Sequence, residues 1–355
     1  MKTPAALVVI ASTLFVLLIA STNSAQNGGV NVSFHTFQDT RSVTVLTPTV
    51  DLVRDMSDRT SIRATFGVDA ISAASDSCAR CHRDGAPNQR TALGVSVTRK
   101  LDAYKVSVGG AYGAEKFYHA TTFTTSLSRD LAEANTTGAG GYTFSLNRPT
   151  LHPMPTVENQ YQNDAFVSVT QTLSKTTIGQ VGYEVERLTG YLDSPFLRAD
   201  VNGVMMLGHV PDSRVRQTLS LRIRQALPAD TFLEADYRHY TDDWELGSNA
   251  FSAGLGHRFT QALLANVSYR RYDQTPAYFY QSSYSGPVPQ YFTADFRLAP
   301  FASNLYTAKA VLGGSLFHFP SGYGVSVQYD RYRSDTGFSS AMFSAGLHIP
   351  LGKNP

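Results

Sequence analysis

Residues 214–227 read RVRQTLSLRIRQAL, and apolar and polar side chains alternate along this stretch with a period of two. Leu219 and Leu221 fall on one side of an extended chain, and Ser220 and Arg222 fall on the other. This period is typical of a β-strand whose two faces meet different surroundings. The same alternation recurs at 61–72, 233–238 and 323–330, and the helical period is absent after Ala25. The sequence therefore predicts an all-β chain.

The alternating segments number about sixteen and match the strand lengths of membrane barrels. They begin near residues 30, 42, 61, 91, 104, 121, 138, 165, 177, 214, 231, 249, 263, 303, 323 and 339. Connections of one parity are tight, at 55–60, 131–137, 174–176, 228–231, 260–263 and 320–323. The other parity includes the four long ones, at 76–90, 147–164, 193–213 and 281–303.

Short turns at one end and long loops at the other are typical of outer-membrane barrels, which place the long loops outside the cell. Lipid offers no hydrogen-bond partners, so strands can span it only in a closed sheet. We therefore expect an antiparallel up-and-down transmembrane β-barrel in the bacterial outer membrane, in contact with its lipid. A soluble secreted β-sandwich is the alternative, because sandwich strands alternate too.

The N-terminus resembles a targeting segment. Lys2 precedes the apolar run at 7–20, and Thr22 and Ser24 are spaced for peptidase cleavage. This pattern predicts a secretory signal peptide at 1–25, cleaved near 24/25, with a retained membrane helix as the alternative. Residues 26–355 are then expected to form a single barrel domain, in which Pro48 inside the second strand implies a bulge or a misplaced boundary.

Composition excludes several classes of function. The 355 residues carry a formal net charge of +2, which argues against a nucleic-acid partner. Two cysteines are too few for a disulfide-built scaffold. Gly-x-Ser-x-Gly, His-Glu-x-x-His, phosphate-loop and nucleotide-binding motifs are missing from the sequence, so we expect no enzyme.

Several stretches carry a resemblance to a known family. They are TPTVDL at 47–52, DAISAAS at 69–75, GYLD at 190–193, PDSR at 211–214 and DYRHYTDDWE at 236–245. On these stretches, residues 42–280 resemble the bacterial family called domain of unknown function 3570, a family of predicted outer-membrane barrels. The resemblance implies an outer-membrane location, a barrel, and a loose association with redox proteins outside the cytoplasm. It implies no activity and no catalytic residue.

One motif carries specific chemistry, in the loop at 76–90. Cys78-Ala-Arg-Cys81-His82 has the spacing of a c-type haem attachment site. Cys78 and Cys81 would form thioethers to one covalent haem c, and His82 would be the proximal iron ligand. A Cys78–Cys81 disulfide is the main alternative, because an exported chain meets an oxidising compartment. A zinc site is less favoured, since only three ligands are local.

A sixth iron ligand would be a histidine or methionine on the long-loop side. The candidates are His119, His152, Met154, Met205, Met206 and His209. For each of them, solvation or packing is the simpler explanation. A single haem cannot bridge an apolar band about 25 Å tall, so electron transfer would need a partner cytochrome or another redox carrier, periplasmic or extracellular.

The polar face of the strands carries charges of both signs. The inward set is Arg63, Asp69, Glu184, Glu186, Arg216, Arg222, Arg224, Glu234, Asp236, Arg238, Arg270, Lys309 and Asp330. Mutual neutralisation and pore hydration explain such a set, and a tuned solute pathway is the alternative. Two functions thus remain open: an electron-transfer barrel with one haem, or a passive porin whose cysteines form a disulfide. A homo-oligomer is a further candidate assembly.

Overall fold

The computed structural model describes residues 28–71, 88–149, 158–194, 197–320 and 322–351. The predicted signal peptide at 1–25 lies outside these residues. Within them, the helical elements are the short 3-10 turns η2 (Phe296–Leu298) and η3 (Gly314–Phe317). Neither of these turns is long and apolar enough to cross a membrane.

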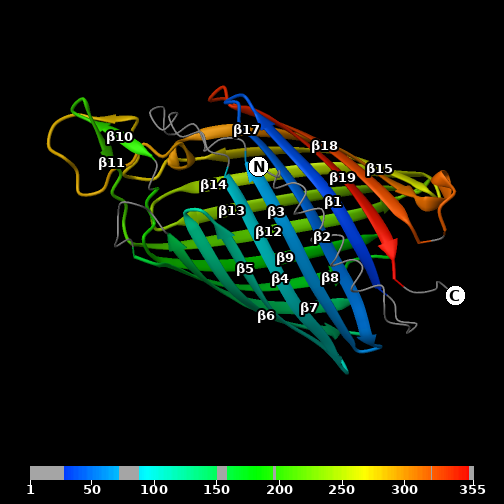
Figure 1. The fold of residues 1–355 in the computed structure, drawn as a ribbon. Helices are drawn as coiled ribbons and strands as arrows, with labels where there is room; N and C mark the ends of the chain where they lie inside the picture. Colours follow the sequence, from blue (N-terminus) through cyan, green and yellow to red (C-terminus); the bar gives the residue numbers. More distant parts are fainter. Residues whose placement is uncertain (1–27, 72–87, 150–157, 195–196, 321, 352–355) are drawn as a thin grey trace, which may run out of the picture.

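Sixteen antiparallel strands form one closed barrel, as predicted (Figure 1). The strands are β1 (Gly28–Asp39), β2 (Thr44–Ser57), β3 (Thr60–Ile71), β4 (Asn88–Leu101), β5 (Tyr104–Glu115), β6 (Tyr118–Leu131), β7 (Thr136–Pro149), β8 (Gln160–Thr172), β9 (Thr177–Gly190), β12 (Ser213–Leu227), β13 (Thr231–Asp242), β14 (Gly247–Thr260), β15 (Leu263–Gln274), β17 (Phe301–Gly313), β18 (Gly324–Ser334) and β19 (Ser339–Pro350). Each strand pairs with its neighbours in chain order, and β1 pairs with β19 to close the sheet.

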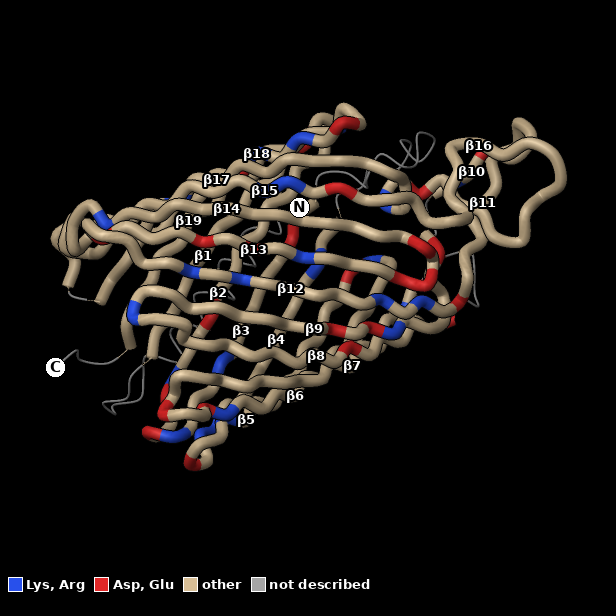
Figure 2. Tube along the Cα trace, turned by 180° about the vertical axis from the view of Figure 1, so that it is seen from behind, with Lys and Arg blue, Asp and Glu red and all other residues tan. Residues whose placement is uncertain are grey.

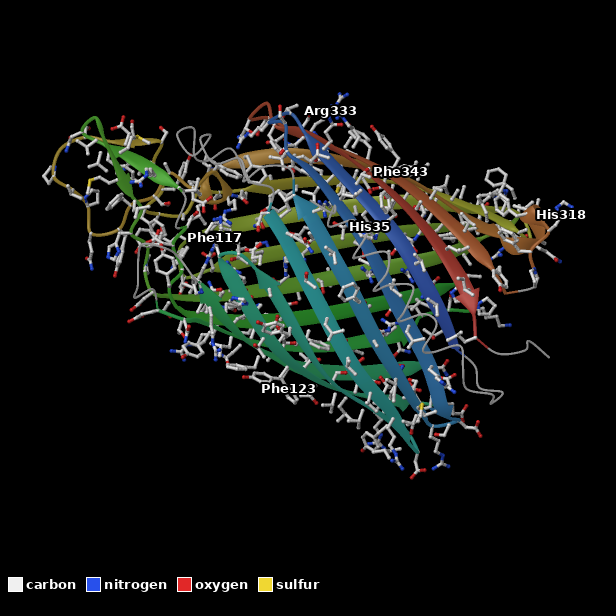
Figure 3. All side chains as sticks on the ribbon, viewed as in Figure 1. His35, Phe117, Phe123, His318, Arg333 and Phe343 are labelled. Atoms are coloured by element: carbon white, nitrogen blue, oxygen red, sulfur yellow. The ribbon has the colours of Figure 1, made fainter. Side chains whose placement is uncertain are left out.

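The alternation of apolar and polar residues in the sequence corresponds to the outer and inner faces of the barrel wall. Phe66, Leu93 and Tyr112 are register partners on β3, β4 and β5, and all lie on the outer face. Phe123 on β6 shares that face, is 48% exposed, and stands at the outer edge of the barrel (Figure 3). On the inner face, small polar side chains of neighbouring strands bond to one another. Thr122 on β6 and Ser145 on β7 form one such pair, with 2.9 Å between their hydroxyl oxygens.

The three longest connections, 72–87, 191–212 and 275–300, all lie at one end of the barrel, as predicted. At the opposite end the strands are joined by turns of two to four residues, except at 314–323, which contains η3 and is as long as the connection at 150–159. The connection at 150–159 lies at the same end as the three longest ones. Every strand of the barrel begins within five residues of its predicted start, and the largest difference is at β8, which begins at Gln160.

Two of the long connections form a small second sheet that the alternation does not predict. It consists of β10 (Arg198–Val201), β11 (Val204–Leu207) and β16 (Ser283–Tyr284), and it projects from the long-loop end of the barrel (Figure 1). β10 pairs antiparallel with β11 and parallel with β16. These strands are too short for a two-residue period to be visible in the sequence.

The predicted bulge or misplaced boundary at Pro48 is wrong. Pro48 lies inside β2, and the ladder to β3 is interrupted there, but the register is the same on both sides of the gap. The Thr47 hydroxyl donates a hydrogen bond to Asp69 across this gap, at 2.7 Å. The sheet thus accommodates one missing N–H without an inserted residue. The register shifts instead lie beside short turns, at Asp55/Ser57 and Arg258/Thr260.

Candidate functional site

The connection at 275–300 packs against the long-loop end of the barrel. Trp244, in the turn between β13 and β14, is 3% exposed and meets Phe279 edge-on, with 5.1 Å between ring centroids. Val210, Leu246, Ala277 and Leu298 complete this buried cluster. The Tyr278 N–H also donates to the Trp244 carbonyl oxygen at 3.0 Å. Apolar burial and backbone bonds therefore fix this connection to the barrel.

The hydroxyl of Tyr284 ties together two parts of the same connection. It donates to the carbonyl oxygen of Phe279 at 2.6 Å, and it accepts the backbone N–H groups of Gln281 and Thr293 at 3.0 and 2.8 Å. Asn202 and Gly286 exchange two further hydrogen bonds between the small sheet and this connection. The segment is thus held at several points along its length.

A cavity of about 470 Å³ lies between this connection and the inner face of the barrel. We call it the mouth cavity. Its polar lining residues are Gln160, Thr218, Tyr240, Ser248, Tyr272 and Gln274, and its apolar ones are Leu188, Leu192, Trp244, Leu246 and Leu298. Four arginines also line it, namely Arg214, Arg216, Arg238 and Arg297, together with a single carboxylate among the described residues, Asp295.

Three of these arginines have carboxylate partners. Arg214 pairs with Asp242, whose side chain is fully buried, and the Arg214 guanidinium lies 4.2 Å from the centre of the Trp244 ring. Arg216 Nη1 donates to Glu186 at 2.7 Å. Arg297 donates to Asp295, and this hydrogen bond raises the pKa of Arg297. These pairs hold the guanidinium groups in place around the cavity.

Two arginines in this lining carry groups without a partner among the described residues. Arg238 makes no ion pair with any described residue, and its side chain projects from the exposed inner face of β13. The Nε of Arg216 is buried and has no hydrogen-bond partner in the described part of the chain. Burial of an unpaired N–H is destabilising, so this atom is a candidate contact for a bound molecule.

Several of the remaining inward charges are paired, in agreement with mutual neutralisation. Arg224 lies 3.0 Å from Glu234, Arg222 pairs with Asp236, and Arg63 lies 3.7 Å from Asp51. Figure 2 shows charged positions gathered on β8, β9, β12 and β13 towards the end that carries the small sheet. Charge is thus concentrated on these four strands without being confined to them, since Arg63 and Asp51 lie on β3 and β2, and hydroxyl pairs also line parts of β1 to β7.

The residues predicted to bind haem lie mostly outside the described residues. This applies to Cys78, Cys81, His82, His152 and Met154. Met205 lies on β11, next to Met206, and His209 pairs through its backbone with Phe292. His119 lies on β6, where its Nδ1 is 3.0 Å from the Tyr112 hydroxyl.

The structure thus brings Met205, Met206 and His209 into the small-sheet region and places His119 apart from them, on the barrel wall. Among the described residues, no group of three or more His, Cys, Asp or Glu side chains could hold a metal ion. The haem assignment stays a prediction from the sequence.

The closed sheet, its apolar outer face, its polar lumen and the division of its loops define an outer-membrane β-barrel protein. The chain belongs to the family described as "Protein of unknown function (DUF3570)", whose profile matches residues 153–341. This match agrees with the resemblance seen in the sequence. No curated protein matches the chain.

Solved structures of low sequence identity share the fold. The outer membrane protein OpdK from Pseudomonas aeruginosa is 6% identical with a TM-score of 0.50, and the match covers 92% of this chain and 98% of OpdK. A bacterial polysaccharide outer membrane secretin is 9% identical with a TM-score of 0.54, covering 93% of this chain and 100% of that one. At these identities the likeness concerns the fold alone.

Sequence reasoning identified Arg216 and Arg238 as inward-facing but missed Arg214 and Arg297. It also missed Trp244 and the whole packed connection at 275–300. One signal was present in the sequence: this connection is rich in aromatic residues, including Tyr278, Phe279 and Phe292. Such residues in a long loop indicate that it packs onto something.

Proposed function

We propose that the protein is a passive channel of the porin type in the outer membrane, without catalytic activity. The observation that carries the proposal is the hydrophilic inner face of a closed sixteen-stranded barrel. Barrels of this size are wide enough to leave an aqueous passage. The connection at 275–300 would narrow this passage at its outer mouth, because it shares the mouth cavity with inward-facing residues of β12 and β13.

Conductance in planar lipid bilayers tests this proposal. Purified full-length protein should produce stepwise increases in current that are linear with voltage at low potentials. Liposomes containing the protein should also swell in isotonic solutions of small neutral sugars. Detergent from a mock purification is the control. Folded, inserted protein that gives neither current nor swelling would contradict the proposal.

Haem binding is a second candidate property, favoured only by the spacing of Cys78, Cys81 and His82. When bound, a haem would supply one-electron redox chemistry, and exchange across the membrane would require a cytochrome or another redox partner. Peroxidase-type staining of outer membranes from the wild type and from a Cys81→Ser variant tests this. Stain in the wild type alone supports haem attachment, whereas a mature mass lower by two hydrogens supports the disulfide.

A further inference from the structure

We propose that the mouth cavity is a binding subsite for small carboxylates that carry an apolar body, such as aromatic acids. The inference rests on the proposed channel function and names the class of solute that the channel would favour. The volume of the mouth cavity, about 470 Å³, lies within the range of small-molecule sites. Two properties of the cavity lining, its positive charge and its apolar side chains, determine the class of ligand that it would bind.

The first is an excess of positive charge. Four arginines line the cavity against one carboxylate, Asp295, and that carboxylate is held by Arg297. When Asp242 and Glu186, the partners of Arg214 and Arg216, are included, four positive charges face three negative ones. One positive charge remains, and Arg238 is the arginine without a carboxylate partner among the described residues. A guanidinium in this state is suited to two parallel hydrogen bonds with a carboxylate.

The position of Arg238 keeps a bound anion away from the acidic side of the lumen. Glu184 and Glu186 lie on β9, whereas Arg238 lies on β13, and β12 separates these two strands. The register places Arg238 opposite Ser220 on β12 and Ala250 on β14, which are both small and uncharged. A carboxylate can therefore approach Arg238 without facing another carboxylate directly.

The second property is the apolar part of the lining. Leu192, Leu246 and Leu298 line the same cavity and belong to the turn and loop segments that cover the end of the barrel. Leu246 and Leu298 are buried, but Leu192 is partly exposed. Tyr240 and Tyr272 add partly exposed aromatic rings to the lining. An inorganic anion would leave these partly exposed side chains facing water. A ligand with an apolar ring or chain would cover them while its carboxylate contacts Arg238, and burial of that apolar area would add to the affinity.

The buried Nε of Arg216 supports a ligand in this place. Arg216 uses Nη1 for Glu186, and its Nε has no hydrogen-bond partner within the described residues. A carboxylate oxygen that reached this N–H would satisfy it. The proposed ligand would thus use two arginines from neighbouring strands, β12 and β13.

Calorimetric titration of the full chain in detergent with benzoate tests the proposal. Acetate lacks the apolar body and benzamide lacks the charge, so both should bind at least about tenfold more weakly than benzoate. Arg238→Ala should weaken benzoate binding by about tenfold or more, because a charge-assisted pair is lost. Arg270→Ala is the matched control, since Arg270 faces the lumen from β15 but does not line the cavity.

The outcomes separate this proposal from the channel function. Unchanged benzoate binding in Arg238→Ala, equal loss in Arg270→Ala, or equal binding of acetate would overturn the subsite. Thermal unfolding of both variants shows whether a loss of binding is a loss of fold, and Arg238→Lys, which keeps the charge, should then restore part of the affinity. Current without benzoate binding would refute the subsite alone. Benzoate binding without current would refute the channel and leave the subsite standing.

Discussion

Asp242, the last residue of β13, is held by hydrogen bonds from several directions. Its buried carboxylate accepts hydrogen bonds from Arg214, from the Tyr240 hydroxyl at 2.6 Å, and from the backbone N–H groups of Trp244 and Leu246 at 2.9 and 3.0 Å. It thereby orders both the turn after β13 and one arginine of the mouth cavity. A buried carboxylate with this many donors has structural importance whatever the channel carries.

We expect Asp242→Ala to lower the free energy of unfolding by about 3–5 kcal/mol, because it leaves the Arg214 charge buried without a partner. Urea unfolding of the protein in lipid vesicles measures this. Asp236→Ala is the control, since the Asp236–Arg222 pair is partly exposed and should be worth about 0–1 kcal/mol. Equal losses in the two variants would contradict this account.

Asp193 should make the loop at 191–212 sensitive to pH. Burial raises the pKa of its carboxyl above the ordinary 3.8, although the Val210 N–H and His209 act in the opposite direction. The folded loop then holds a proton that the unfolded loop releases. Its stability is therefore greatest below about pH 3.8 and falls as the pH rises through the raised pKa.

Hydrogen exchange of the Val210 amide, which donates to Asp193 at 3.0 Å, measures this effect after correction for the intrinsic exchange rate. Protection should decrease as the pH rises in the wild type and should stay level in Asp193→Asn. Parallel profiles for the two proteins would show that another group is responsible.

At the scale of elements, the strands and the positions of the long connections were predictable, but the packing of the connections was not. A strand of a membrane barrel has one face towards lipid and one towards the lumen. Its sequence must therefore alternate between apolar and polar residues. The packed connection at 275–300 has no such period, because its contacts come from Trp244 and Tyr284, at irregular spacings. The mouth cavity depends on this connection, and for that reason only its barrel side could be foreseen, through Arg216 and Arg238.

Removal of the connection should widen the channel. Replacing residues 277–298 by a short Gly-Ser linker removes the cover of the mouth cavity while the ladder between β15 and β17 stays in place. We expect a larger single-channel conductance than in the wild type. A linker that replaces residues 335–338, the short turn between β18 and β19, is the control and should leave conductance unaltered. An unchanged conductance in the deletion variant would mean that this connection does not limit the passage.

At the scale of the whole molecule, the barrel wall has an apolar outer face and a polar inner face. The structural neighbours share the fold, and the sequence alone was sufficient to predict the strand number and the end of the barrel that carries the long loops. Its failure at Pro48 arose because β2 can lose one ladder bond without a shift in register. The low strand propensity of proline does not indicate whether the pairing with a neighbouring strand tolerates such a gap.

Neighbouring positions on β6 test the two sides of the wall. Phe123 faces outward and Thr124 faces the lumen. Phe123→Lys should destabilise folding into vesicles by about 2–4 kcal/mol, because a charge near the bilayer midplane is costly. Thr124→Lys, one residue further along, should be nearly neutral, since its ammonium group reaches water. Equal effects at the two sites would contradict the assignment of the faces.

The pairing of β1 with β19 also bears on biogenesis. The His35 imidazole meets the Ser344 hydroxyl at 2.8 Å across more than three hundred residues of intervening chain. β1 therefore emerges early in synthesis and waits for its second neighbour until almost everything else has been made. Throughout that interval its free edge offers unpaired amides to any other nascent polypeptide. A chaperone that covers this edge would thus be needed long before the barrel can close.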